Sequence, residues 1–322
     1  MRLVTFAAHG LTRAGVIAGD NTVVAVADLV PGAPDDMIGL IERWPELQER
    51  LGAAVRNASD ATPLAQVRLL APIPRTPKNI ICLGHNYKEH IIESQRAQGL
   101  EIRMPEYPVF FTKSPLSISA PDTDVEIDQA VTQKVDWEGE LGIVIGKRGR
   151  DLPDSDVAYE YVFGYTAAND LSARDLQQRM QGSQQQWFKG KSLDGFCPLG
   201  PWIVTRDEIP DPHSLEIMTR VNGVTKQHSN ASDFLFRVPR ILQDISAGMT
   251  LEPGDVILTG TPSGVGNART PKEFLQPGDV VEVEIGEIGV LRNRIVARHG
   301  HDEMQVGSPT AAARAGSGGT SR

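Results

Sequence analysis

The chain has 322 residues, which is long enough for one large domain and a small one with a sizeable core. Its net charge of −9, without any cluster of Lys and Arg, argues against a nucleic-acid partner. The chain lacks a secretion signal and the ~20 consecutive apolar residues that a bilayer-spanning helix needs, so we expect no membrane partner and a cytoplasmic location.

The first part of the chain predicts a small α/β domain. Short β-like runs cover residues 3–7, 15–18 and 23–27. An amphipathic helical pattern follows and is interrupted at Pro45. Residues 68–77 contain three prolines and favour an extended connector. We therefore expect an amino-terminal domain over residues 1–71.

The rest of the chain predicts a β-dominated α+β domain of mixed strand order over residues 72–298, with helices at its periphery. We expect one helix around His90, one over 171–180 with Ser172 and Asp175 as a capping pair, and one over 234–247 that is bent or started at Pro239. Residues 299–322 are rich in Gly, Ser and Ala, and we expect this tail to be disordered. The strands are expected at residues 79–83, 109–112, 136–146, 162–170, 202–205, 215–221, 255–259, 280–285 and 290–297.

Two acidic residues run into an apolar strand at residues 136–146. Alternate residues of a strand share a face, so Glu138 and Glu140 point the same way, about 6–7 Å apart. Buried acids need compensation, which a divalent metal would supply, whereas at an exposed strand end they would face water or pair with Lys or Arg. Asp170, at the end of the next predicted strand, is a third candidate ligand or, alternatively, a helix N-cap. Three carboxylates would suit Mg²⁺, Mn²⁺ or Ca²⁺.

Other polar residues have the spacing of a proton-transfer site. His90 and Glu93 share a helix face, so Glu93 could orient the imidazole of a general base, or the pair could be a surface contact. Lys191 or Lys189 could stabilise an enolate or grip a carboxylate, or be solvated. The glycine-rich segment 260–266 lacks the features of a phosphate loop and is interpreted as a substrate-contacting turn.

Five motifs, in order along residues 72–297, are similar to the fumarylacetoacetate hydrolase family, in its branch of acylpyruvases and 2-hydroxyhepta-2,4-diene-1,7-dioate isomerases. These motifs are Gly84-His85-Asn86-Tyr87 with His90 and Glu93, Trp137-Glu138-Gly139-Glu140-Leu141, Asn169-Asp170-Leu171-Ser172-Ala173-Arg174-Asp175, Gly190-Lys191-Ser192 with Cys197-Pro198, and the segment from Gly254 to Pro262.

The resemblance implies a mixed β-sheet roll, a homodimer and a site for Mg²⁺ or a similar ion. It places the metal on the residues matching Glu138, Glu140 and Asp170. It also assigns water activation to a lid helix with His90 and Glu93. It implies substrate contacts for the side chains of Arg174, Gln177, Lys191 and Thr261. His85 departs from the family pattern, where we expect Arg or a smaller or aliphatic residue.

The resemblance further implies an enzyme that acts on a small oxo acid. Our leading hypothesis is metal-dependent hydrolysis of a carbon–carbon bond in a 2,4-dioxo acid such as an acylpyruvate, fumarylpyruvate or fumarylacetoacetate, with His90, Glu93 and Lys191 as catalytic groups. Alternatives are decarboxylation or tautomerisation of an oxaloacetate-like or dienedioate substrate, ureidoglycolate lyase action, or a metal-bound scaffold without turnover.

Overall fold

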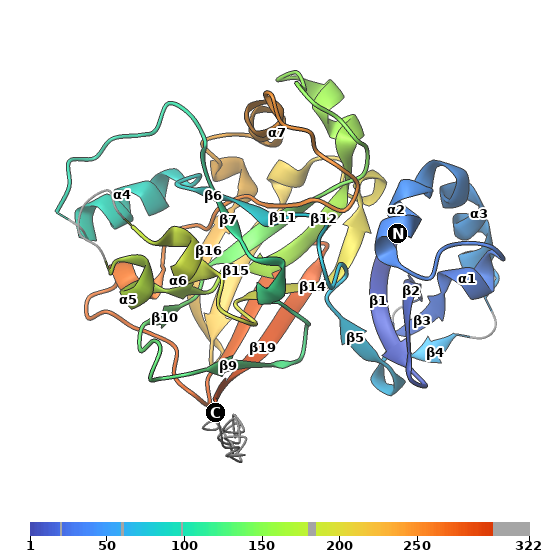
Figure 1. Ribbon diagram of the computed structural model, residues 1–322, viewed down its shortest axis with the longest axis horizontal. Helices are drawn as coiled ribbons and strands as arrows, with labels where there is room; N and C mark the ends of the chain where they lie inside the picture. The colour runs from blue at the N-terminus through green and yellow to red at the C-terminus, as the bar shows by residue number, and fades with distance from the viewer. Residues whose placement is uncertain (20, 59–60, 98, 180–184, 299–322) are drawn as a thin grey trace, which may run out of the picture.

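A computed structural model describes residues 1–19, 21–58, 61–97, 99–179 and 185–298 (Figure 1). The predicted tail at 299–322 and the last residue of the helix predicted at 171–180 lie outside the described residues. In the described part, no helix is long and apolar enough to cross a membrane.

A 12-stranded sheet forms most of the fold, with the order β4-β3-β2-β1-β14-β12-β11-β17-β6-β7, β5 beside β1 and β8 beside β14. β17 runs parallel to β6, whereas β11 is antiparallel to both of its neighbours, so the strand order is mixed as predicted. The strands are β1 Arg2–Ala8, β2 Leu11–Ala18, β3 Thr22–Ala25, β4 Thr62–Pro63, β5 Arg68–Leu70, β6 Ile80–Gly84, β7 Val109–Lys113, β8 Ile118–Ser119, β11 Gly139–Ile145, β12 Val162–Asn169, β14 Cys197–Thr205 and β17 Val256–Leu258.

A five-stranded sheet of order β16-β15-β18-β19-β9 packs against the large one, and a two-stranded ribbon pairs β10 with β13. Helices α4, α5 and α6 lie at the opposite end of the large sheet from α1, α2 and α3 (Figure 1). The remaining strands are β9 Asp124–Ile127, β10 Val135–Asp136, β13 Ser172–Ala173, β15 Glu216–Val221, β16 Val224–Asn230, β18 Val280–Ile285 and β19 Gly289–Ala297. The helices are α1 Val26–Leu29, α2 Met37–Glu42, α3 Trp44–Arg56, α4 Lys88–Ala97, α5 Arg174–Gln177, α6 Trp187–Lys191 and α7 Val238–Ser246.

Both faces of β11 are buried, which explains the apolar run that follows Glu140 in this strand. Leu141 and Ile143 join a core cluster with residues of the five-stranded sheet and α7, whereas Val144 joins a second cluster with α2 and α3. Cys82 and Cys197 are buried free thiols. The fold is therefore the predicted α+β arrangement of mixed sheets with helices at the periphery.

The amino-terminal strands continue the large sheet. β1 pairs with β14 through Arg2–Val204 and Leu3–Ile203, so the sheet crosses the predicted boundary at residue 71 without a break. The division of the chain at that residue stays a prediction.

The helix expected over residues 171–180 is wrong in its first part. Ser172 and Ala173 pair with β10 as strand β13, and only Arg174–Gln177 is helical. Ser172 does not cap this turn, because its hydroxyl donates to the carbonyl of Asp170, and Asp175 instead accepts from the hydroxyl of Thr132. The other three helix predictions are closer: the amphipathic pattern divides into α2 and α3 near Pro45, the helix around His90 is α4, and α7 begins with Pro239 in its first turn.

Gly139 lets the two sheets approach each other next to the acidic residues of β11. A Cβ at this position would lie 2.1 Å from Oγ1 of Thr219 on β15 and 3.1 Å from Cγ1 of Val283 on β18. Neither sheet can move away cheaply, because both are held by their strand ladders.

We expect Gly139→Ala to lower the free energy of unfolding by about 1–3 kcal/mol, because the added methyl overpacks this contact. Urea unfolding followed by circular dichroism measures the effect. Gly286→Ala is the matched control, since its added methyl would come no closer than 3.6 Å to another heavy atom. Equal losses in the two variants would contradict the prediction.

His213 supports the start of α7 as a buried neutral imidazole. Its Nε2 accepts the backbone N–H of Val238 at 3.2 Å, and its Nδ1 lies 3.2 Å from Oδ1 of Asp211. Burial lowers the pKa of His213. A proton on Nε2 would remove the acceptor for the first N–H of the helix.

Because the pKa of His213 is lowered in the folded protein, acid should lower the free energy of unfolding. The unfolded chain takes up a proton at His213 near pH ~6.5, while the folded chain resists it. The folded protein should therefore lose stability as the pH falls below that value, and His213→Gln should lose less between pH 7 and pH 5 than the wild type. Urea unfolding at the two pH values measures the difference, with the exposed His228→Gln as control. Parallel losses in all three proteins would refute this role.

Candidate active site

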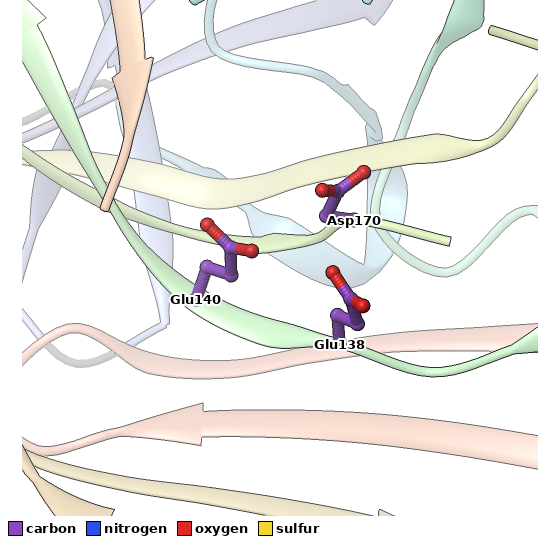
Figure 2. Close-up of side chains that lie close together, drawn as sticks. All are labelled: Glu138, Glu140 and Asp170. Carbon is purple, nitrogen blue, oxygen red and sulfur yellow. The ribbon is translucent and has the colours of Figure 1, made fainter. Parts of the chain in front are cut away.

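The three carboxylates predicted to bind a metal meet where β11 begins and β12 ends. Gly139 pairs with Asn169 in the antiparallel ladder, so Glu138 and Asp170 flank the same end of the two strands. Glu140 lies on the same face of the strand as Glu138. The three residues are at most 5% exposed, and a carboxylate oxygen of each lies within 4.8 Å of the other two. Figure 2 shows the three side chains gathered in one site.

Three buried cations pair with these carboxylates. Nζ of Lys191 lies 2.6 Å from Oε2 of Glu138 and 2.6 Å from Oδ2 of Asp170. Nζ of Lys113 lies 2.6 Å from Oδ1 of Asp170, and Nη2 of Arg174 lies 2.6 Å from Oε1 of Glu138. Burial of so many charges is tolerated because each cation has a partner at hydrogen-bond distance.

Asp136 adds a fourth buried carboxylate. It accepts from Nε of Arg174 at 2.8 Å and from the backbone N–H groups of Gly266 and Asn267 at 2.7 and 3.0 Å. Burial raises the pKa of Asp136. These bonds attach the segment after β17 to the arginine that holds Glu138.

Glu140 receives the least compensation of the four carboxylates. The backbone N–H of Gly260 donates to it at 2.7 Å, but it forms no ion pair with any described residue. Burial, followed by the charges of Asp170 and Glu138, raises its pKa well above the usual range. Burial also acts to raise the pKa of Glu138, but the charges of Lys191 and Arg174 outweigh burial, so the pKa is lowered.

The donor set fits a hard divalent cation. Carboxylate oxygens are the ligands that Mg²⁺ and Mn²⁺ prefer. Four carboxylates against three cations leave one negative charge in excess, and Glu140 carries it without an ion pair. The residues that would hold the ion are Glu138, Glu140 and Asp170.

His90 and Glu93 form the predicted pair on α4. Nδ1 of His90 lies 2.9 Å from Oε1 of Glu93. Both oxygens of Glu93 accept the backbone N–H of Gly264 at 3.0 Å, so the pair is also tied to the glycine-rich segment. Since Nδ1 is held by the carboxylate, Nε2 is the ring nitrogen left to exchange a proton.

A pocket of about 170 Å³ connects the imidazole with the carboxylate cluster. This volume lies below the ~300–1,000 Å³ of sites for drug-sized ligands and suits a small acid. The four residues predicted to contact substrate all line it, and they are Arg174, Gln177, Lys191 and Thr261. The rest of its wall includes His85, His90, Glu138 and Trp187.

The predicted substrate residues are held by protein groups. Arg174 is engaged by carboxylates, and its Nη1 donates to Oε1 of Gln177 at 3.0 Å. The hydroxyl of Thr261 donates to the carbonyl of Gly139 at 3.0 Å. They therefore form a fixed wall, and their contact with substrate stays a prediction.

Sequence reasoning missed Lys113 and Asp136. Lys113 ends the apolar strand β7 and is fully buried, and a lysine there signals a buried acid as its partner. Asp136 begins the same acidic segment as Glu138 and could have been counted with it. Of the two lysines considered for the site, Lys191 reaches the carboxylates, whereas Lys189 is exposed.

Comparisons with known proteins show the family of this chain. Residues 79–296 match the family described as Fumarylacetoacetate (FAA) hydrolase C-terminal. The chain is 48% identical to the oxaloacetate tautomerase YisK of Bacillus subtilis over 232 residues, which are 72% of this chain and 74% of YisK. It is 40% identical to the mitochondrial oxaloacetate tautomerase Fahd2a of Rattus norvegicus over 299 residues, 92% of either chain.

A solved structure matches over nearly the whole chain. It is the maleylpyruvate hydrolase of Sphingobium sp. SYK-6 in complex with manganese(II) and pyruvate, with 31% identity, a TM-score of 0.75 and coverage of 93% of this chain and 100% of that one. These relatives are enzymes, and the range matched by the family spans the part of this chain that carries the buried carboxylates. This chain belongs to the fumarylacetoacetate hydrolase family.

Proposed function

We propose that this protein is a metal-dependent enzyme that interconverts the keto and enol forms of a short 2-oxo acid, with oxaloacetate as the first candidate. The observation that carries the proposal is a cluster of three buried carboxylates that reaches one small pocket through Glu138, where a carboxylate-held histidine also lies. The two tautomerases similar to this chain support the choice of reaction.

The reaction needs one group that moves a proton and others that stabilise an enolate. In oxaloacetate, a proton leaves carbon 3 and one is delivered to the oxygen on carbon 2, so the substrate neither gains nor loses atoms. Nε2 of His90 takes up and returns the proton, while Glu93 holds the ring and stabilises its charged form. Glu93 is itself fixed by the backbone N–H of Gly264.

Charge at the enolate oxygen is the main barrier to this chemistry. A divalent cation held by Glu138, Glu140 and Asp170 would neutralise charge on the carboxylate and enolate oxygens. Lys191 keeps its proton because, although burial opposes this, Asp170 and Glu138 raise its pKa. Its ammonium group thus adds a fixed positive charge beside the same oxygens.

Carbon–carbon hydrolysis, the leading hypothesis from the sequence, is the second candidate. The His90–Glu93 pair could hold a water for attack on a carbonyl, and the maleylpyruvate hydrolase with 31% identity uses the same fold. Tautomerisation has more support, because it needs no bound water and is the reaction named for the relative with 48% identity. Decarboxylation of oxaloacetate would use the same enolate.

The homodimer, the absence of a nucleic-acid partner and the cytoplasmic location remain predictions.

The test compares the Mg²⁺-loaded and Mn²⁺-loaded protein with chelator-treated protein. Loss of the enol absorbance of freshly dissolved oxaloacetate reports tautomerisation, and chromatography of products from oxaloacetate and acylpyruvates reports decarboxylation and hydrolysis. We expect metal-dependent tautomerisation, faster than either other reaction. Metal-dependent pyruvate release from an acylpyruvate, with no effect on the enol of oxaloacetate, would favour the hydrolase instead.

In the same assay, we expect Glu140→Gln to lower metal affinity and kcat/KM by about 100-fold or more, because it removes a charged ligand. Metal content after dialysis and turnover are measured together. Glu42→Gln, a change at the exposed last residue of helix α2, is the control and should alter neither. Full metal content and full turnover in Glu140→Gln would end the proposal.

We expect His90→Gln to lower kcat by about 10²–10⁴-fold, because it removes the proton-transfer group. Its metal content should equal that of the wild type, since His90 is not among the three carboxylates. Enol absorbance and metal analysis are the two readouts. A variant that tautomerises oxaloacetate at the wild-type rate would show that another group moves the proton.

A further inference from the structure

His85 occupies a special place in the pocket wall. It follows the last residue of β6 and has a φ of 59°, in the left-handed region that residues other than Gly, Asn, Asp and His rarely adopt. Its ring lies between two aromatic neighbours in the same wall, with centroids 6.4 Å from the ring of His90 and 6.2 Å from that of Trp187. The ring is therefore held beside the proton-transfer group.

The imidazole of His85 has an unsatisfied nitrogen. Nδ1 is buried and has no hydrogen-bond partner among the described residues. Of the buried side-chain atoms that lack a partner, Nδ1 of His85 is the one that belongs to a residue lining this pocket. A buried polar atom without a partner costs free energy, so an orphan at a pocket wall points to a ligand group.

The cations of the pocket are already committed. Among the described residues that line it, Lys191 and Arg174 are the cations, and both pair with carboxylates at its floor. His85 stays neutral at pH 7, because burial and the nearby His90 lower its pKa to about 4. It therefore offers one N–H donor and one acceptor to a bound molecule.

We propose that His85 determines specificity by donating a hydrogen bond to the second carboxylate of the substrate, so that the pocket selects a four-carbon 2-oxo dicarboxylate over a 2-oxo monocarboxylate. The proposal rests on the proposed function only in placing the 2-oxo acid end of the ligand at Glu138, Glu140 and Asp170. With that end anchored, the rest of a small acid must extend along the wall formed by His85 and Trp187. The N–H of His85 would form a hydrogen bond with a carboxylate oxygen at the far end of the ligand, but it would have no partner if a methyl group stood there.

The test uses two ligands that cannot enolise and differ only at the far end. Malate is a four-carbon 2-hydroxy dicarboxylate, and 2-hydroxybutyrate has the same chain with a methyl group in place of the second carboxylate. Their dissociation constants are measured by calorimetry on the Mg²⁺-loaded full-length protein, and the KM and kcat of oxaloacetate tautomerisation are measured in parallel.

Three substitutions separate the donor from the backbone. His85→Phe keeps a ring without its nitrogens, and His85→Gly removes the side chain while favouring the left-handed backbone. His85→Asn keeps an N–H donor and tolerates the same backbone. Circular dichroism and thermal unfolding show whether each variant is folded. The Gly variant keeps the test informative if Phe does not fold.

We expect the wild type to prefer malate over 2-hydroxybutyrate by about 10- to 100-fold, as one hydrogen bond to a charged group provides. The Phe and Gly variants should lose this preference. They should also raise the KM for oxaloacetate by a similar factor, with kcat within about threefold of the wild type. The Asn variant should keep most of the preference for malate. An unchanged preference in folded Phe or Gly variants, or no preference in the wild type, would overturn the proposal.

The binding arm separates this inference from the proposed function. If the wild type prefers malate through His85 but does not tautomerise oxaloacetate, the specificity role stands and the reaction is a different one. If it tautomerises oxaloacetate and the His85 variants bind both ligands as the wild type does, the function stands and the specificity role fails.

Discussion

The fold depends on the burial of a charge cluster between the start of β11 and the end of β12. Isolated charges in such a place would be too costly, so the four carboxylates and three cations are mutually dependent. Removal of one member of a buried pair typically costs 3–5 kcal/mol, because its partner is left charged without compensation. Lys191 is the clearest case, since it pairs with acids from both sides of the strand junction. The cluster is therefore a structural unit, and it is also the site of the proposed function.

Backbone amides of the segment after β17 connect this cluster to the rest of the site. Within residues 260–266, Gly260 donates to Glu140, Gly264 to Glu93 and Gly266 to Asp136. Helix α4, strand β11 and the β10 ribbon are thereby tied to one short stretch of chain. Glycine suits this stretch: at Gly264, where φ is 105°, a Cβ would lie 2.1 Å from the carbonyl oxygen of Lys226, and at Gly266 a Cβ would lie 1.9 Å from that of Glu273. A movement of this segment would consequently reach both the proton-transfer pair and the metal carboxylates.

The same electrostatic arrangement can serve several reactions. Buried carboxylates that outnumber the buried cations would attract a metal ion, and such an ion with Lys191 would stabilise an enolate, whichever bond or proton produced it. Tautomerases and a hydrolase with this fold can therefore share the carboxylates and differ in groups farther along the pocket. His85 is such a group, because it lies beside His90 but is engaged by no described residue through Nδ1.

Local patterns in the sequence were enough to place the acids and the proton-transfer pair. Period-two alternation puts Glu138 and Glu140 on one face of a buried strand, and the spacing of three residues puts His90 beside Glu93 on a helix. Both follow from the geometry of a single element, so no tertiary information is needed. The same local reasoning failed at residues 171–173, where pairing of Ser172 and Ala173 with β10 overrides the helical pattern.

Only the tertiary structure decided which groups compensate the acids. Lys113 lies 57 residues before Asp170 in the chain, and Gly260 lies 120 residues after Glu140, yet both are in hydrogen-bond contact with them. Likewise, β1 extends the large sheet by pairing with β14, a partner that no local signal indicates. Periodicity describes which way a side chain points from its own strand or helix. Which residue contacts that side chain depends on sheet order and long-range packing, and these are set by the free energy of the whole fold.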